Sequence, residues 1–235
     1  SFFLQTSPEQ YMKRLLARGA GKIYQICKCF RKDERGARHL EEFTMLEWYR
    51  LDADYHNLME DCRQLLQFII KRLGDTPEFR KIVGRSCLAE MDINGDWQHL
   101  SVEDAFSRFS PISMEDALAA GSFDEMIVDC IEPELGSTAP CFLYDYPASC
   151  ASLAKKKIDN NNVAERFELY VRGMELANGF SELTDPDEQR HRFEEEMKLI
   201  GARGDSADMP EKFLKDLEYI DTAAGIAFGV DRLLM

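Results

Sequence analysis

The amino-acid sequence predicts an α+β fold, in which an antiparallel β-sheet is flanked by helices. Two pairs of strand-like segments are each joined by a polar loop or a tight turn, as in antiparallel hairpins. Other segments carry apolar residues at helical spacing. No internal repeat or low-complexity linker interrupts the 235 residues, a length that suits one large domain or two small ones.

The first elements are expected to be a helix within residues 6–21 and then a hairpin. Ser7 is a good N-cap, and Pro8 suits the first helical position. Gln10 completes a capping box, and Gly19 ends the helix. The segments "KIYQICKCFR" and "EFTMLEWYRL" have the composition of strands, and the charged loop between them predicts an antiparallel hairpin with a long tip.

A long helix is expected next, because residues 52–74 have the strongest helical periodicity of the chain. From Asp75 to Ala139 the pattern weakens. Short helices are expected to start near Ser101 and Ser122. We interpret residues 75–139 as a partly helical insertion packed beside the main sheet.

The remaining elements continue the alternation of strands and helices. "PCFLYDYP" is expected to be a short strand, and "VAERFELYV" with "MELANGFSEL" a second hairpin. A charge-rich amphipathic helix follows, with Asp185 as its cap. The final "AAGIAFGVDRLLM" predicts a strand with glycines that continues into a helix.

Composition excludes several classes of protein. No apolar run approaches the roughly 18 residues of a membrane span, and no signal-peptide pattern is present. The net charge of −14 argues against a broad nucleic-acid-binding surface, although it leaves room for a local basic cleft. The seven cysteines include no C-x-x-C pair, which favours reduced core cysteines in a cytoplasmic protein over a disulfide framework or a zinc site. The chain has no initiator methionine and ends in an apolar run, so both ends are expected to be truncated.

Acidic residues mark the second hairpin as a candidate site. With a two-residue turn at Arg172 and Gly173, Glu168 and Glu175 share one face of the hairpin, with Cα atoms ~7–8 Å apart. Two such carboxylates suit a cation such as Mg²⁺, which takes one or two carboxylates plus substrate phosphates. Alternatively, they are two solvated acids on an exposed sheet face.

A third acid, Glu182, has the opposite parity along the strand and would point away in a regular hairpin. A bend or bulge at Asn178 and Gly179 would turn it toward the other two. We therefore predict that Glu182 needs a local irregularity to join Glu168 and Glu175.

Two further clusters have features of a nucleotide site. Arg31 ends a strand beside a polar loop and suits a phosphate, while Phe43 beyond the loop suits stacking on a base. In "GIAFGVDRLL", Gly225 and Gly229 allow close backbone approach, and Arg232 could stack on a base through its planar guanidinium. A surface salt-bridge patch and a tight helix–sheet packing site explain these clusters equally well.

Taken together, these segments resemble known motifs. "FRKDE…RHLEEF" is similar to motif 2 of the class II aminoacyl-tRNA synthetases, and "GIAFGVDRLLM" is similar to their motif 3. "TSPEQYMKRLL", "FTMLEWY" and "ELANGFSELTD" resemble the lysyl-tRNA synthetase subgroup. Within it, "YQICKCFR", "MLEWYR" and "GVDRLLM" look most like the elongation factor P–lysine ligase family, which lacks the anticodon-binding domain. Ala227 stands where that family has Ala and lysyl-tRNA synthetases usually have Gly.

This resemblance implies a single class II synthetase-like catalytic domain over residues 1–235. It also implies ATP-dependent activation of (R)-β-lysine or lysine to an adenylate, with Mg²⁺, followed by transfer to a lysine side chain of elongation factor P. A homodimer is expected, and tRNA is not expected to be a substrate.

The resemblance also implies roles for individual residues. Arg31 and Arg232 are the expected catalytic residues, and Glu168 and Glu175 the expected metal ligands. The expected ATP-binding residues are Arg31, Asp33, Leu40, Phe43, Glu175, Leu176, Gly229 and Arg232. The expected substrate-binding residues are Ser7, Glu9, Glu47, Tyr49, Asn178, Glu182 and Ala227.

Some positions depart from the pattern of the ligase family. Asp33 replaces the motif 2 Glu, Leu40 replaces an Asn, and Ser181 is more similar to the tRNA synthetases. Two alternatives therefore stay open: the catalytic core of a lysyl-tRNA synthetase, and a non-catalytic paralogue that serves as a binding module.

Overall fold

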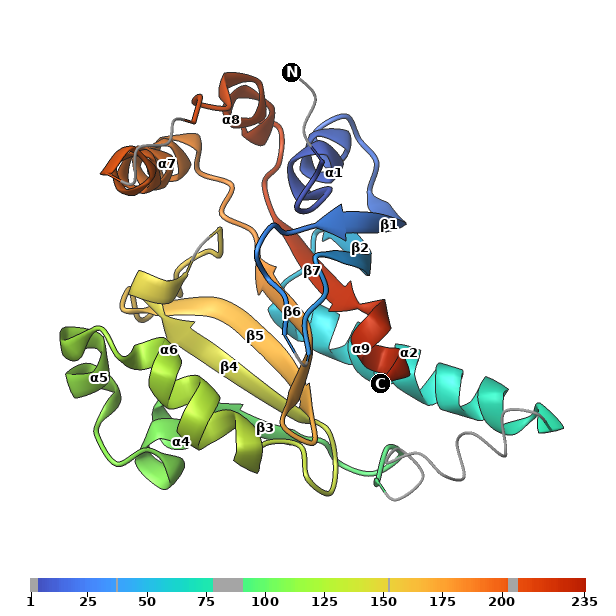
Figure 1. The fold of residues 1–235 in the computed structure, drawn as a ribbon. Helices are drawn as coiled ribbons and strands as arrows, with labels where there is room; N and C mark the ends of the chain where they lie inside the picture. Colours follow the sequence, from blue (N-terminus) through green and yellow to red (C-terminus); the bar gives the residue numbers. More distant parts are fainter. Residues whose placement is uncertain (1–3, 37, 78–90, 152, 203–206) are drawn as a thin grey trace.

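The computed structural model of the chain describes residues 4–36, 38–77, 91–151, 153–202 and 207–235. Across these residues one sheet runs in the order β1-β2-β7-β6-β5-β4-β3 (Figure 1). Neighbouring strands are antiparallel except for the parallel pair β3 and β4. The strands are β1 (Lys22–Phe30), β2 (Glu42–Leu51), β3 (Gln98–Ser101), β4 (Cys141–Pro147), β5 (Val163–Val171), β6 (Met174–Ser181) and β7 (Ala223–Gly229).

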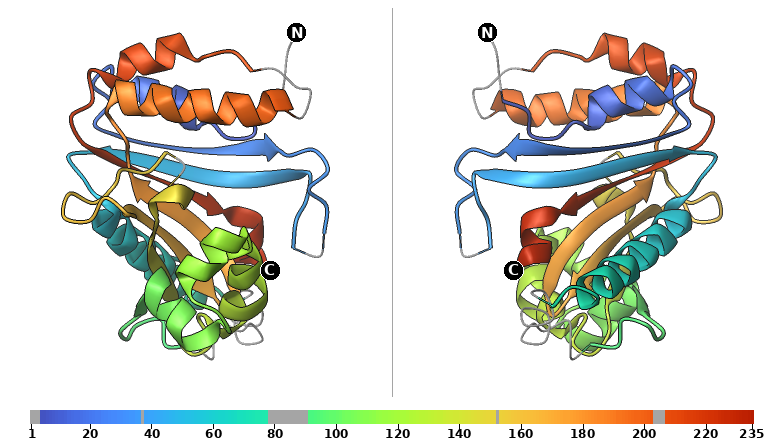
Figure 2. Two further views of the ribbon diagram at one scale, coloured as in Figure 1. Left: turned by 90° about the vertical axis from the view of Figure 1, so that its left-hand side faces the viewer. Right: turned by 90° about the vertical axis from the view of Figure 1, so that its right-hand side faces the viewer.

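Helices surround this sheet, as the α+β prediction requires. They are α1 (Glu9–Leu16), α2 (Tyr55–Gly74), α4 (Val102–Phe109), α5 (Met114–Ala120), α6 (Phe123–Met126), α7 (Pro186–Ala202), α8 (Glu211–Leu217) and α9 (Val230–Leu234), with short turns η2 (Ile127–Ile131), η3 (Glu132–Glu134) and η4 (Ala148–Cys150). Figure 2 shows α1, α7 and α8 as a layer over the β1–β2 end, while α2 runs along the sheet. In the described residues, no helix is both long and apolar enough to cross a membrane.

Side-chain alternation gives the central strands two different faces. Leu58 and Cys62 of α2 pack in a buried cluster with Phe167 of β5 and with Ile226 and Phe228 of β7. Because successive strand residues point to opposite faces, the residues between these apolar ones project from the other side of the sheet. The core on the α2 side therefore leaves the opposite face for polar side chains.

The middle segment differs from its prediction. Residues 75–139 were expected to pack beside the sheet, but Gln98–Ser101 joins it as the edge strand β3, parallel to β4. The predicted helix starts hold, since α4 follows the N-cap Ser101 and α6 follows Ser122. Residues 78–90 of this segment lie outside the described residues.

The start of α1 also corrects the prediction. Pro8, and not Ser7, is the N-cap, and Gln10 makes no capping box. The Ser7 hydroxyl still accepts a hydrogen bond from the Glu9 N–H at 3.0 Å, but it donates its own proton to Glu47 across the sheet. A residue that the local pattern assigned to a helix cap is thus used in a tertiary contact.

The predicted hairpin of β5 and β6 is present, with Tyr170 opposite Glu175 and Val171 opposite Met174. Arg172 and Gly173 both have positive φ, as a tight two-residue turn requires. The register shifts directly after Tyr170, so that Leu169 faces Ala177 and Leu176 is the extra residue of a bulge.

The irregularity is therefore real but was predicted at the wrong place. It lies at Leu176, before Asn178 and Gly179, because Leu176 and Ala177 both pack into the core on the α2 side. The bulge changes the parity of β6, so that Asn178 and Glu182 project from the same face as Glu168.

Candidate active site

Strand register brings the candidate residues together in two rows across the sheet. Glu168 of β5 faces Asn178 of β6, Asn178 faces Ala227 of β7, and Ala227 faces Glu47 of β2. Paired residues project from the same side of a sheet. One continuous row of residues, with one residue from each of four strands, therefore runs from Glu168 to Glu47.

The second row lies beside the first and follows the same strands. Arg166 faces Phe180, Phe180 faces Gly225, and Gly225 faces Tyr49. Residues of both rows line a cavity of about 620 Å³. This volume is in the usual range for a small-molecule site.

One end of the cavity is rich in buried acids. Glu47 is only 1% exposed, and its two oxygens accept hydrogen bonds from Ser7 Oγ at 2.7 Å and Tyr49 Oη at 2.8 Å. Burial raises the pKa of Glu47, although these two hydrogen bonds oppose the rise. Glu9 lines the same end. This end can hold positively charged groups such as ammonium ions.

A buried ion cluster lies behind that end. Lys13 of α1 contacts Glu9 Oε1 at 2.6 Å and forms an ion pair with Glu182 Oε2. Neither Lys13 nor Glu182 lines the cavity. Glu182 Oε1 is buried without a hydrogen bond and points toward Gly225, where an added Cβ would lie 2.4 Å from it.

Glu168 lines the cavity, and both of its oxygens are occupied. Its Oε1 accepts from Arg166 Nη2 at 2.7 Å and from Asn178 Nδ2 at 3.1 Å. Its Oε2 accepts from Tyr146 at 2.6 Å and from Tyr170 at 2.7 Å. Four donors on one carboxylate fix its position.

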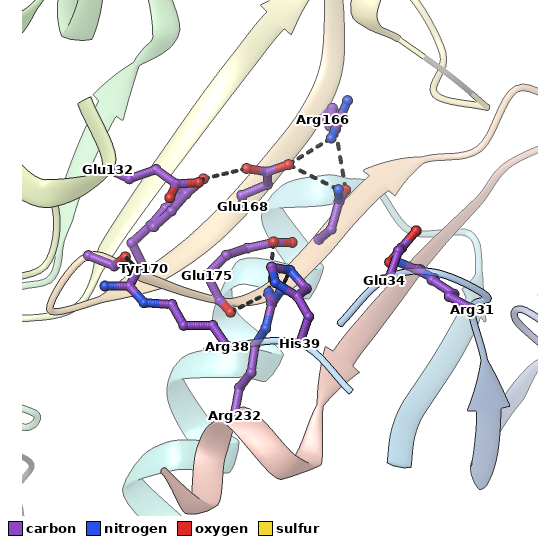
Figure 3. Close-up of polar contacts among 12 residues, drawn as sticks. Arg31, Glu34, Arg38, His39, Glu132, Arg166, Glu168, Tyr170, Glu175 and Arg232 are labelled. Carbon is purple, nitrogen blue, oxygen red and sulfur yellow. Dashed lines mark hydrogen bonds and ion pairs between the residues drawn. The ribbon is translucent and has the colours of Figure 1, made fainter. Parts of the chain in front are cut away.

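Glu175 is held less completely. Arg232 donates to its Oε2 and to its backbone oxygen, both at 2.8 Å, and no described residue donates to Oε1. Burial and the charge of Glu168 raise the pKa of Glu175, and Arg232 opposes this. Figure 3 shows the Glu175 carboxylate beside Arg232 and His39, and the Glu168 carboxylate between its donors, with Arg166 on one side.

Of these two acids, Glu175 is the one with room for a divalent cation, because donors already take all four lone pairs of Glu168. In the described residues no group of three or more His, Cys, Asp or Glu side chains forms a metal site. Mg²⁺, however, needs only one or two carboxylates when substrate phosphates complete its ligands. Burial and Glu168 raise the pKa of Glu175, so a cation beside this carboxylate would offset an unfavourable charge.

The other end of the cavity carries Arg31 and Phe43. The Arg31 guanidinium lies 5.3 Å from the centre of the Phe43 ring and pairs with Glu34 at 3.6 Å. Glu34 lines the cavity, whereas Asp33 does not. Asp33 has a positive φ of 64°, and its side chain is 83% exposed. The loop thus presents Glu34, and not Asp33, to the cavity.

The β1–β2 loop reaches across to the other hairpin. Arg38 Nη1 donates to the Gly173 backbone oxygen at 2.9 Å, and His39 Nε2 lies 2.9 Å from Arg232 Nη2. Leu40, which is 58% exposed, also lines the cavity. The loop therefore forms part of the cavity wall.

Most residues that the resemblance singled out meet in this one cavity. The exceptions are Asp33, which faces solvent, and Glu182, which pairs with Lys13 behind the wall. The expected residues that line the cavity are Ser7, Glu9, Arg31, Leu40, Phe43, Glu47, Tyr49, Glu168, Glu175, Leu176, Asn178, Ala227, Gly229 and Arg232.

Sequence reasoning missed several partners of these residues. Lys13 lies one helical turn after Glu9, a spacing that predicts their ion pair. Arg166 precedes Glu168 by two residues on β5 and so shares its face. Tyr146 and Glu132, which contacts Tyr170 at 3.2 Å, come from distant segments and left no local signal.

Comparison with known proteins gives a consistent result. The family model of class II tRNA synthetases (D, K and N) matches residues 1–235. A protein of Proteus mirabilis (strain HI4320) is 41% identical over 239 residues, covering 99% of this chain and 72% of that protein. One of Edwardsiella ictaluri (strain 93-146) is 40% identical over 236 residues, with 99% and 72% covered. One of Pectobacterium atrosepticum is 40% identical over 244 residues, with 100% and 73% covered. Each is named elongation factor P–(R)-β-lysine ligase.

Proposed function

This chain belongs to the class II tRNA synthetases and, among them, to the elongation factor P–(R)-β-lysine ligases, and we propose that it carries out their reaction in the cavity described above. It is an ATP-dependent ligase that activates (R)-β-lysine or lysine and transfers it to elongation factor P. The observation that carries the assignment to this cavity is the row Glu168–Asn178–Ala227–Glu47, which joins a phosphate-and-metal end to an ammonium end.

The first step needs charge stabilisation more than a nucleophilic side chain. The substrate carboxylate attacks the α-phosphorus of ATP, a P–O bond to the leaving pyrophosphate breaks, and an aminoacyl-adenylate forms. Arg31, which lines the cavity, would stabilise the charge that grows on the α-phosphate. Phe43 and Arg232 supply flat surfaces for the adenine. Glu175, beside Glu168, would hold Mg²⁺, which screens the phosphate charges when bound.

The second step transfers the acyl group. A lysine amine of elongation factor P attacks the adenylate carbonyl, AMP leaves, and the amine loses a proton as the amide forms. Glu9 and Glu47 position the ammonium groups of the substrate throughout, and Ala227 lies in the cavity wall between Asn178 and Glu47. Holding both reactants in one cavity supplies much of the acceleration.

Several further features complete the proposal. The protein acts in the cytoplasm as a homodimer and does not use tRNA as acceptor.

Ser181, the position most similar to tRNA synthetases, does not line the cavity. It is 4% exposed, and its hydroxyl accepts a hydrogen bond from the Tyr55 N–H at 3.0 Å. Its identity therefore affects packing against α2 and not the choice of acceptor.

Pyrophosphate exchange and acceptor transfer test this function directly. We expect ATP–pyrophosphate exchange with (R)-β-lysine or lysine, and transfer to elongation factor P but not to tRNA. Exchange with neither amino acid would contradict the enzyme assignment. Transfer to tRNA alone would replace the ligase by a lysyl-tRNA synthetase.

A pair of variants locates the chemistry. Arg31→Ala is expected to lower exchange by roughly 100-fold or more, since one lost charge-stabilising donor costs about that much. Lys32→Ala is the matched control, because Lys32 is adjacent but its side chain is 90% exposed. Equal exchange rates in the two variants would remove Arg31 from the mechanism.

A further inference from the structure

Lys13 is a deeply buried cation beside the cavity, and no role has been assigned to it above. It is 2% exposed, and its Nζ contacts Glu9 Oε1 at 2.6 Å and pairs with Glu182 Oε2. The same Nζ lies 5.2 Å from the ring centre of Phe180 and 6.0 Å from that of Phe213. Two carboxylates and two ring faces thus surround one ammonium.

The position of this ammonium links the cavity to its support. Glu9 and Phe180 line the cavity, whereas Lys13 and Glu182 lie behind them. Lys13 holds one oxygen of each acid, Glu9 Oε1 and Glu182 Oε2. The remaining oxygen of Glu182 is buried without a hydrogen bond and is directed at Gly225 of the cavity wall.

The charge of Lys13 is secured by these contacts. Burial alone would favour its neutral form, but Glu182 and Glu9 together raise the pKa of Lys13 above its ordinary value. Burial raises the pKa of Glu182 to about 8, and Lys13 opposes that rise. Removal of Lys13 would therefore leave Glu182 as a buried carboxyl with no cation.

From this geometry we propose that Lys13 is a positioning residue for amino-acid binding. Its ammonium orients Glu9 and Glu182 and, when Glu9, Glu47 and Glu182 are all ionised, neutralises one of these three acids. Two negative charges then remain for a substrate that brings two ammonium groups. The inference rests on the proposed function for the identity of that substrate, and it makes Lys13 a determinant of selectivity for diammonium amino acids.

Binding experiments with Lys13→Met test the proposal. The dissociation constants of lysine and (R)-β-lysine, measured by calorimetry without ATP, are expected to rise roughly 10- to 100-fold, as for a lost charge-assisted contact. The KM for ATP is expected to stay within about twofold, since the nucleotide end does not contact Lys13. Amino-acid affinity of the variant should also become more pH-dependent and improve as Glu182 ionises at higher pH.

Arg14→Met is the matched control. Arg14 is the next residue of α1, but it pairs with Asp216 at 2.6 Å and does not line the cavity. The substitution removes the same charge from the same helix. The amino-acid affinity of the Arg14→Met variant is therefore expected to match that of the wild type. An equal loss in both variants would show that only the helix or the net charge matters, and would overturn the proposal.

Chemical rescue separates charge from volume. In Lys13→Ala the missing atoms correspond to n-propylammonium, so this cation should restore amino-acid affinity in a saturable way, and neutral n-propanol should not. Rescue by both compounds would mean that Lys13 only fills space. Wild-type affinity in folded Lys13→Met would equally refute the proposal.

Two other results would also distinguish between the hypotheses: variants that do not fold, and a wild type that lacks exchange or binding. If the single variants do not fold, Lys13→Met with Glu182→Gln removes the uncompensated carboxyl and is expected to fold, with amino-acid affinity still at least about tenfold weaker. Wild-type affinity in this double variant would overturn the proposal.

If the wild type binds the amino acids but shows no pyrophosphate exchange, the proposed function fails while the Lys13 comparison stays valid. If the wild type binds neither amino acid, both fail.

Discussion

At the scale of the residue, close packing at a glycine determines where the ammonium-binding groups lie. A Cβ at Gly225 would lie 2.2 Å from Tyr49 Cε1 and 2.4 Å from Glu182 Oε1. Tyr49 in turn donates to Glu47. The absence of one methyl group thus lets an aromatic ring and two acids meet over the β7 backbone.

Gly225→Ala is expected to disturb both stability and amino-acid binding. Overpacking of this kind costs about 1–3 kcal/mol, which lowers Tm by roughly 2–10 °C for a domain of this size. The displaced Tyr49 should also raise the KM for the amino acid more than the KM for ATP. Calorimetry and pyrophosphate exchange measure the two effects.

Gly74→Ala is the control for this variant, because a Cβ there meets nothing within 4 Å. Because Gly74 ends helix α2, its replacement by alanine is expected to leave stability unchanged or raise it by up to about 1 kcal/mol. If Gly225→Ala were as stable and as active as Gly74→Ala, the close approach of Tyr49 and Glu182 to Gly225 would be wrong.

At the scale of the element, two hairpins meet over the cavity. The β1–β2 loop is tied to the β5–β6 turn by the hydrogen bond from Arg38 to the Gly173 oxygen, and to α9 by the contact between His39 and Arg232. Both contacts join segments that are far apart in the sequence. They hold the loop residues Arg31 and Leu40 at the nucleotide end.

Arg38→Met is expected to release this loop from the turn. The KM for ATP should rise by roughly 5- to 10-fold, the equivalent of one net hydrogen bond of about 1 kcal/mol or slightly more. The KM for the amino acid should change less, because Glu47 and Tyr49 belong to the β2 strand and not to the loop. Steady-state kinetics with each substrate varied in turn provides the measurement.

Arg35→Met serves as the control, since Arg35 is an exposed cation of the same loop that does not line the cavity. The Arg35→Met substitution removes the same charge from the same loop but leaves the hydrogen bond from Arg38 to the Gly173 oxygen in place. An equal rise of the KM for ATP in both variants would indicate a long-range charge effect and contradict the tie.

Element types followed from local sequence, but contacts between elements did not. The alternating pattern of β2 and the turn at Gly173 were sufficient to predict both hairpins, because turn chemistry and periodicity are local properties. The bulge was predicted at Asn178 and Gly179 but lies at Leu176. Its position depends on the packing of Leu176 in the buried cluster that includes α2 residues, which local sequence does not reveal. Strand β3 was missed because four residues in a parallel edge pair carry little periodicity.

The same distinction explains the candidate site. Glu168 and Glu175 could be placed on one face from the turn alone. The exchange of Asp33 for Glu34 depends on a positive φ at Asp33, which the residue type does not reveal. The partners of Glu182 also escaped prediction, because Lys13 lies far away in the sequence and its helix meets the sheet only in the folded protein.

At the scale of the whole molecule, folding collects acids in a place where burial opposes their charge. Burial raises the pKa of Glu47 and Glu175, and it raises the pKa of Glu182 to about 8. A carboxyl whose pKa is raised by folding contributes stability that is fully present below its unfolded pKa. That contribution is lost as the pH rises through the folded pKa. The substrate-free protein therefore becomes less stable toward alkaline pH.

The free energy of unfolding is expected to fall between about pH 4.5 and 8, and Glu182→Gln is expected to flatten this slope. One proton contributes at most about 1.4 kcal/mol per pH unit. Glu47 and Glu175 contribute in the same direction, so the difference between the wild type and Glu182→Gln measures the share of Glu182. Above about pH 6.5 the lowered pKa of His99 no longer contributes. The thiols of Cys29 and Cys141, with pKa values raised to about 12 and about 11, act at higher pH. Urea unfolding at several pH values measures both slopes.

Glu211→Gln is the control, because the exposed carboxyl of Glu211 has a lowered pKa that affects stability only in acid. Parallel slopes for the wild type and Glu182→Gln would show that Glu182 is ionised throughout, so that Lys13 outweighs burial at this site.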